Sequence, residues 1–163
     1  MRAAKSKIMS REKLAGVLAA EKSKGARTVF ANGCFDTLHA GHVRYLEGAR
    51  NEGTLLVVGV NADAGVRDLK GTGRPILDEI ARALLVAALR SVDYVVIFPE
   101  ANVESLLEEL RPHVHAKGTD YTAENVPERA TADRLGIRVA IVGDPKQHST
   151  RELLDSIRKG LHG

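Results

Sequence analysis

The chain has 163 residues, of which 44% are hydrophobic and 28% are charged, and its formal net charge at pH 7 is +3. This length suits one domain with a full core, and the single cysteine excludes an internal disulfide and indicates a reducing compartment, so we expect a cytoplasmic protein. No apolar run approaches the roughly 20 residues of a membrane-spanning helix, and the scattered basic residues do not favour a nucleic-acid partner.

Helical and strand patterns alternate along the chain. The sequence predicts helices at residues 11–24, 40–51, 80–89, 103–110, 127–135 and 149–158, and strands at 28–31, 55–60, 94–98, 113–116 and 137–142. Residues 61–77, which are rich in Gly, Asp and basic side chains, are expected to form a loop.

The strands are apolar throughout, which indicates a parallel sheet covered by helices on both faces. The predicted fold is therefore a Rossmann-like, doubly wound α/β/α sandwich of about five strands, forming a single domain over residues 1–163 with its core at about 27–158. In such sheets ligands bind at the carboxyl ends of the strands, near the switch in strand order.

The segment after the first predicted core strand carries most of the functional information. Residues 32–42 read Asn-Gly-Cys-Phe-Asp-Thr-Leu-His-Ala-Gly-His. A strand, a tight turn and a helix that opens on His-Ala-Gly-His direct free backbone N–H groups at one point, which favours anion binding. His39 and His42 lie on one face of that helix and are expected to reach the same phosphate. The alternative is a pair of structural histidines at a helix end; metal-ligand spacing is absent, so no metal site is predicted.

The expected role of the two histidines is electrostatic. The second pKa of a phosphate monoester is about 6, so it is a dianion at neutral pH and attacks another phosphate without a general base. Imidazole N–H groups then stabilise the charge that develops on the transferred group. Cys34 has no activating partner in the sequence and is predicted to pack or to contact phosphate through its backbone. Asp36 is expected to cap the helix, to orient a histidine or to help hold Mg²⁺.

A second motif, residues 70–75, reads Lys-Gly-Thr-Gly-Arg-Pro. Its two cations, Lys70 and Arg74, lie on a glycine-rich loop and suit a clamp that closes on phosphates, although a solvated turn is the alternative. Arg82 follows on the next predicted helix, where it either contacts substrate or forms an ion pair with Asp78.

Polar residues also occupy other predicted strand ends. Asn61 and Asp63 follow the second core strand and are expected to hydrogen-bond a polar substrate. Residues 117–121, Lys-Gly-Thr-Asp-Tyr, directly follow the fourth strand. Ser149 and Thr150 open the last predicted helix, either as caps or as ligands of a triphosphate oxygen.

Four motifs in order resemble those of the nucleotidyltransferase superfamily with the His-x-Gly-His element: residues 32–42, Lys70-Gly-x-x-Arg74-Pro75, Val92-Asp-Tyr-Val-Val and Lys117-Gly-x-Asp-Tyr121. Within it they are most similar to the heptose-1-phosphate adenylyltransferases, which form one half of the bifunctional heptose kinase/adenylyltransferase. The resemblance implies transfer of AMP from ATP to D-glycero-β-D-manno-heptose 1-phosphate, with Mg²⁺, for lipopolysaccharide core synthesis. It also implies a homodimer or higher homo-oligomer.

The site residues predicted from the motifs and the resemblance fall into three groups. They are, for catalysis, His39, His42 and Lys70; for nucleotide binding, Gly33, Cys34, Phe35, Gly41, Lys117, Asp120, Tyr121, Ser149 and Thr150; and for substrate binding, Asp36, Asn61, Asp63, Arg74 and Arg82. Two other functions stay open: a cytidylyltransferase acting on glycerol 3-phosphate or a similar phospho-alcohol, and a non-catalytic nucleotide- or RNA-binding module.

Overall fold

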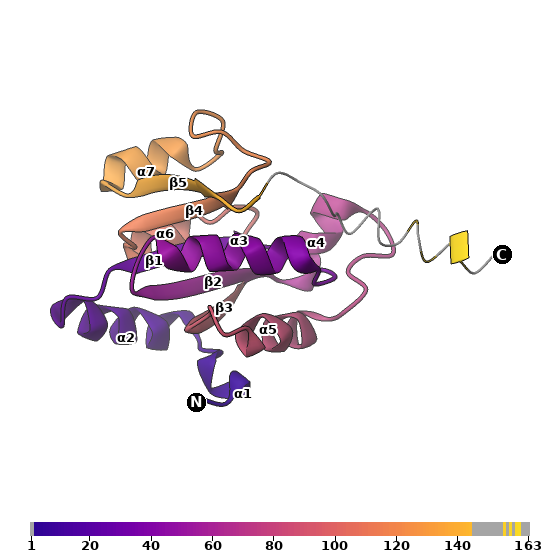
Figure 1. Ribbon diagram of the computed structural model, residues 1–163, viewed down its shortest axis with the longest axis horizontal. Helices are drawn as coiled ribbons and strands as arrows, with labels where there is room; N and C mark the ends of the chain where they lie inside the picture. The colour runs from indigo at the N-terminus through magenta and orange to yellow at the C-terminus, as the bar shows by residue number, and fades with distance from the viewer. Residues whose placement is uncertain (1, 145–154, 156, 158, 161–163) are drawn as a thin grey trace.

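Five parallel strands form one sheet in the order β3-β2-β1-β4-β5 (Figure 1). The computed structural model describes residues 2–144, 155, 157, 159 and 160. Its strands are β1 (Thr28–Gly33), β2 (Leu55–Asn61), β3 (Tyr94–Phe98), β4 (Val114–Gly118) and β5 (Arg138–Val142). Its helices are α1 (Ala4–Lys7), α2 (Arg11–Ser23), α3 (Ala40–Asn51), α4 (Asp63–Lys70), α5 (Glu79–Ala88), α6 (Glu104–Leu110) and α7 (Arg129–Leu135). The predicted parallel α/β sandwich is confirmed, while most of the helix expected at 149–158 lies outside the described residues.

The sheet separates two apolar clusters, which explains why its strands are apolar on both sides. Helices α3 and α5 cover one face, where their buried side chains pack on alternate strand residues such as Val29 and Ala31. Helices α2, α6 and α7 cover the other face, where Phe30 belongs to the second cluster. Successive residues of β1 thus point to opposite layers, as the pleat of a strand requires.

The prediction of a loop over residues 61–77 is wrong in part, because residues 63–70 form helix α4. Gly65 and Val66 are buried on its inner side, and this packing against β2 outweighs the low helix propensity of glycine. Helix α4 ends at Lys70, and the φ of 87° at its C-cap residue, Gly71, suits a residue without a side chain. The carboxyl end of α4 consequently holds Lys70 at a defined place rather than on a long loop.

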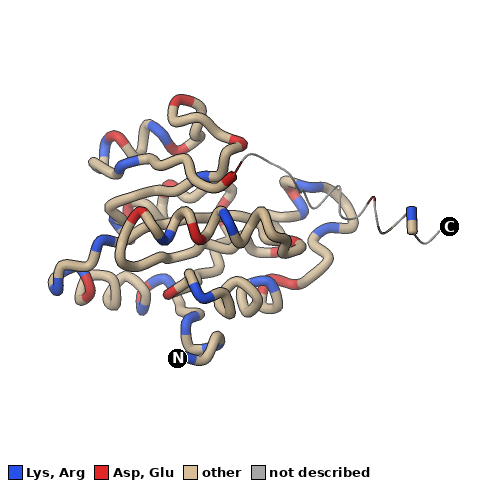
Figure 2. The backbone as a smooth tube through the Cα atoms, viewed as in Figure 1, with Lys and Arg blue, Asp and Glu red and all other residues tan. Residues whose placement is uncertain are grey.

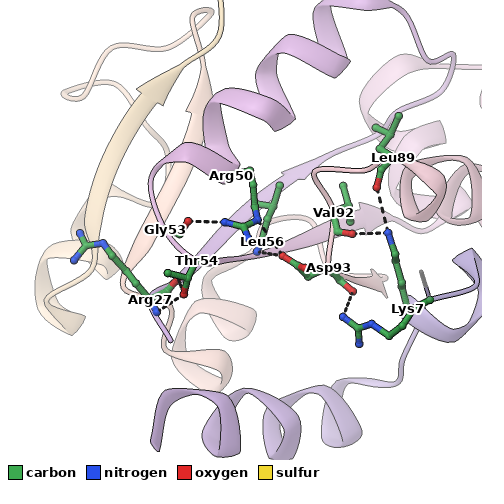
Figure 3. Close-up of polar contacts among 10 residues, drawn as sticks. Lys7, Arg27, Arg50, Gly53, Thr54, Leu56, Leu89, Val92 and Asp93 are labelled. Atoms are coloured by element: carbon green, nitrogen blue, oxygen red, sulfur yellow. Dashed lines mark hydrogen bonds and ion pairs between the residues drawn. The ribbon is translucent and has the colours of Figure 1, made fainter. Parts of the chain in front are cut away.

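The segment before α2 covers the edge strand β3, and it includes α1, a single turn that the sequence pattern did not predict. The ammonium Nζ of Lys7 donates to the carbonyl oxygens of Leu89 and Val92, at 3.2 and 2.7 Å (Figure 3). Beside it, the carboxylate Oδ2 of Asp93 accepts a hydrogen bond from the Leu56 backbone N–H at 2.8 Å (Figure 3). These contacts join β2, β3 and the end of α5. Among the described residues, no helix is long and apolar enough to cross a membrane.

Candidate active site

A cavity of about 930 Å³ lies at the carboxyl edge of the sheet. Residues at the ends of all five strands line it, together with the first turn of α3 and the last turn of α4. The volume is within the range of small-molecule sites, which is roughly 300–1,000 Å³. The switch in strand order falls between β1 and β4, so the cavity lies where doubly wound sheets bind ligands.

Eleven of the predicted site residues line this cavity. They are Gly33, Cys34, Phe35, His39, Gly41, His42, Asn61, Lys70, Lys117, Asp120 and Tyr121. Asp36, Asp63, Arg74 and Arg82 do not belong to the lining. Ser149 and Thr150 lie outside the described residues. The fold therefore brings three separate sequence motifs to one cavity.

The two histidines lie side by side where α3 begins. Their rings stack with centroids 3.9 Å apart and planes at 26°, and the Phe35 ring packs edge-on against His42 at 5.2 Å. Phe35 is buried and has a φ of 47°, so the turn after β1 is tight. His39 is the N-cap residue of α3, and its side chain forms no capping hydrogen bond. The start of α3 thus offers backbone N–H groups and two imidazoles to a ligand in the cavity.

Asp36 and Arg74 form an ion pair beside the cavity. The fully buried Asp36 carboxylate accepts from Arg74 Nη1 at 2.5 Å and from the Ile76 backbone N–H at 2.7 Å. Both carboxylate oxygens therefore hold the loop after α4, and the expected capping of α3 by Asp36 is wrong, because His39 is the N-cap residue of that helix. Substrate contact by these two residues stays a prediction, and the structure itself gives them the task of ordering the loop.

Arg82 is fully buried and joins three segments around the cavity. Its guanidinium donates to the Cys34 carbonyl oxygen at 2.6 Å, the Asp63 carboxylate at 2.8 Å and the Leu77 carbonyl oxygen at 3.0 Å. The expected alternative partner, Asp78, instead caps α5 by accepting from the backbone N–H of residue 81. The alternative prediction, an ion pair between Arg82 and Asp78, is therefore wrong. The sequence pattern predicts Asp63 as a site residue but missed its pairing with Arg82, because the two residues lie 19 positions apart in the chain.

Lys70 remains as a cation at the cavity, and in the described part of the chain we find no ion pair for it. Its ammonium lies close enough to Cys34 to oppose the effect of burial on that thiol. Burial nevertheless raises the pKa of Cys34, against the lowering influence of the Lys70 and Arg82 charges. Cys34 donates to Asn61 Oδ1 at a sulfur–oxygen distance of 3.9 Å. A thiol that stays protonated at neutral pH is a poor nucleophile, in agreement with the packing role expected for Cys34.

The cavity lining also contains polar residues that the site prediction did not include, among them Asn32, Arg44 and Glu128. Asn32 belongs to the quoted motif and lies near the carboxyl end of β1, which is a signal that the prediction overlooked. Arg44 forms an ion pair with Asp144 at 3.4 Å. Glu128 forms a buried ion pair with Lys117 at 3.2 Å, and no local pattern indicates that pairing.

A buried histidine beside the cavity predicts an acid-sensitive stability. Burial first, and the Lys117 charge second, lower the pKa of His115 from 6.5 to about 3. Below pH 6.5 the His115 ring is protonated in the unfolded chain but stays neutral in the folded protein. The contribution of His115 to the free energy of unfolding is therefore fully present above pH 6.5 and is lost as the pH falls towards 3. We expect His115 to contribute a slope of about 1.4 kcal/mol per pH unit in that window.

Urea unfolding of the wild type and of His115→Gln at pH 7, 6, 5 and 4 measures this slope. The free energy of unfolding of the glutamine variant is expected to fall less steeply with pH, because its unfolding takes up about one proton fewer than that of the wild type. Burial also lowers the pKa of His113, which contributes equally to both proteins. Parallel curves for the two proteins would contradict the prediction.

The fold and the cavity define a doubly wound α/β protein with a switch-point cavity and paired histidines at the start of a helix. The chain belongs to the cytidylyltransferase-like family of nucleotidyltransferases, whose family model matches residues 30–154. It is similar to "Bifunctional protein HldE" of Pelobacter propionicus, with 49% identity over 152 residues, and to that of Geobacter sulfurreducens, with 47% over 153 residues. These matches cover 93% and 94% of the chain but only 31% of each relative, so the chain spans about a third of their length.

The fold is also similar to a solved structure, described as the lipopolysaccharide core biosynthesis protein from Thermoplasma volcanium. The TM-score is 0.65 at 27% sequence identity, covering 75% of this chain and 100% of that one.

Proposed function

We propose that the protein transfers AMP from ATP to D-glycero-β-D-manno-heptose 1-phosphate, giving ADP-heptose and pyrophosphate for the lipopolysaccharide core. The observation that carries this proposal is the stacked pair His39 and His42 at the start of α3, in a cavity that also contains Lys70. The similarity to "Bifunctional protein HldE" and to a lipopolysaccharide core biosynthesis protein supports the choice of acceptor.

The proposed chemistry is a single in-line displacement at the α-phosphorus of ATP. An oxygen of the heptose 1-phosphate forms the new P–O bond while the bond from the α-phosphorus to the bridging oxygen breaks, and pyrophosphate leaves with that electron pair. The attacking phosphate is already anionic, so the protein supplies no base. His39 and His42 donate N–H groups to oxygens whose charge grows in the transition state, and Lys70 neutralises the phosphates.

We also propose that Mg²⁺ accompanies the nucleotide. The described residues include no group of three or more His, Cys, Asp or Glu side chains placed to hold a metal. The cavity lining does include the carboxylates of Asp120 and Asp144. This fits Mg²⁺, which is usually held by one or two carboxylates, several waters and substrate phosphates. When bound, the ion would neutralise phosphate charge.

A pyrophosphate-release assay on the purified protein tests the proposed function. ATP and CTP are each combined with heptose 1-phosphate and with glycerol 3-phosphate, and the nucleotide-sugar product is identified by mass spectrometry. We expect turnover with ATP and heptose 1-phosphate. Turnover confined to CTP and glycerol 3-phosphate would instead support the cytidylyltransferase alternative.

The non-catalytic RNA-binding alternative gains little support from the charge distribution. Figure 2 shows Lys and Arg positions interspersed with Asp and Glu positions along the described chain. Many of the basic side chains are paired with acidic ones, as in the exposed pair of Arg134 and Glu108. Proteins that bind nucleic acid through its phosphates concentrate basic residues on one face.

Two further proposals concern the state of the protein in the cell. We propose a homodimer or higher homo-oligomer, which the exposed apolar side chains of Ile76, Ile80 and Leu84 support, with 52%, 62% and 44% of their surface accessible. Sedimentation equilibrium tests it, and a monomer at micromolar concentration would contradict it.

We also propose a cytoplasmic location, which the lone cysteine supports, and cell fractionation tests it.

A further inference from the structure

Asn32 and Lys117 lie next to each other at the switch point of the sheet. The two central strands pair so that Phe30 lies opposite His115. Because side chains alternate along a strand, Phe30 and Asn32 of β1 share a face with His115 and Lys117 of β4. The Phe30 and His115 rings are indeed in contact, with centroids 5.8 Å apart. One step towards the carboxyl edge, the same face carries Asn32 and Lys117 into the cavity lining.

Two donors meet on the side-chain oxygen of Asn32. The Lys117 ammonium lies 3.3 Å from Asn32 Oδ1, and the His115 ring nitrogen Nε2 lies 3.2 Å from the same atom. An ammonium group only donates, so the Asn32 atom that faces Lys117 is its oxygen. The Nε2 atom of His115 must then carry a hydrogen in order to bond that oxygen. Both contacts therefore fix the orientation of the Asn32 amide.

The other ring nitrogen of His115 shows that this arrangement has a cost. Nδ1 is buried and, within the described part of the chain, forms no hydrogen bond. The neighbouring Val114 and Ala116 are fully buried apolar residues, and an apolar residue at position 115 would avoid the unpaired nitrogen. Burial also keeps the ring neutral, since the pKa of His115 is lowered to about 3. The hydrogen bond that the His115 ring donates to Asn32 Oδ1 therefore explains why a histidine occupies this buried position.

The charge of Lys117 is balanced within the protein. Its ammonium pairs with the buried Glu128 carboxylate at 3.2 Å and lies 4.9 Å from the centre of the Tyr121 ring. Lys117 therefore interacts with both Asn32 and Glu128. The Asn32 amide keeps two N–H donors for which the described residues provide no acceptor. Amide N–H groups that line a cavity suit the oxygens of a phosphate.

We propose that His115 is a positioning residue which, together with Lys117, holds Asn32 so that its amide N–H groups donate to a phosphate oxygen of the bound nucleotide. This inference rests on the proposed function, which places ATP in the cavity. Asn32 is the residue that contacts the ligand, and His115 acts only through Asn32.

A double-mutant cycle on nucleotide affinity tests the inference. The dissociation constant of ATP with Mg²⁺ is measured by calorimetry for the wild type, Asn32→Ala, His115→Leu and the double variant. A hydrogen bond to a charged group contributes about 1.5 kcal/mol or more, so Asn32→Ala is expected to weaken ATP binding about 10-fold. His115→Leu should weaken it similarly, and the double variant should lose no more than Asn32→Ala alone.

Two matched variants separate positioning from packing. His115→Gln keeps an N–H donor within reach of Asn32 and is expected to restore most of the ATP affinity. His115→Phe removes the donor but still packs on the Phe30 ring, so it should behave like His115→Leu and replaces it if the leucine variant does not fold. Losses that multiply to about 100-fold in the double variant would overturn the inference. So would weakened binding of heptose 1-phosphate alone with unchanged binding of ATP.

The two levels of proposal fail in different ways. ATP binding by the wild type without formation of ADP-heptose would overturn the proposed function alone, because the cycle needs no acceptor. Formation of ADP-heptose with multiplicative losses in the cycle would overturn the positioning role alone. Absence of nucleotide binding by the wild type would overturn both.

Discussion

Replacing His42 by alanine is expected to lower kcat for adenylyl transfer about 10²- to 10³-fold, because a donor to the transition-state charge is lost. The His42 ring stacks on His39 and contacts Phe35, so both histidines act from one point at the start of α3. The KM for ATP should change much less than kcat, since the interaction strengthens mainly as the phosphorus is attacked. Steady-state kinetics with pyrophosphate detection measures both constants.

The control for this prediction is His42→Gln, which keeps an N–H donor on a flexible side chain and should retain part of kcat. Urea unfolding of both variants shows whether either change acts through the fold. A kcat within about threefold of the wild type for His42→Ala would remove His42 from the mechanism. In that case the stacked pair would be structural, which is the alternative that the sequence left open.

Replacing Arg82 by methionine is expected to lower the free energy of unfolding by about 3 kcal/mol, the lower end of the range for breaking a buried ion pair. Arg82 is fully buried, whereas its partner Asp63 keeps 28% of its side-chain surface and can be partly hydrated after the change. The methionine also leaves the Cys34 and Leu77 carbonyl oxygens without their donor. Urea unfolding at pH 7 measures the loss.

Arg134→Met is the matched control, because Arg134 is 57% exposed and pairs with Glu108 on the surface. Its loss should be about 1 kcal/mol or less. Unchanged stability of Arg82→Met together with lost activity would instead support the substrate contact that the sequence predicts for Arg82. A large loss of stability supports the role seen in the structure, in which Arg82 joins the segments around the cavity.

Most of the predicted site residues that the structure describes line the cavity, because they lie in short continuous motifs. In residues 32–42 the strand, the turn and the helix start are adjacent in the chain, so local geometry alone brings the histidines to one point. Helix α4 was missed because Gly65 and the charged residues around it hide a short amphipathic helix. Its stability comes from packing against β2, with Gly65 and Val66 buried, and a pattern of propensities does not include such packing.

The sequence by itself determined the parallel α/β architecture and the end of the sheet at which ligands bind. Both follow from local regularities: apolar strands alternate with helices, and motifs directly follow the strands. The tertiary structure alone decided which polar groups face one another across the sheet edge. Asp36 binds Arg74, Arg82 binds Asp63, and Asn32 accepts from both His115 and Lys117. These partners lie 19 to 85 positions apart, and only the packing of strands, helices and loops at the sheet edge brings them within hydrogen-bond distance.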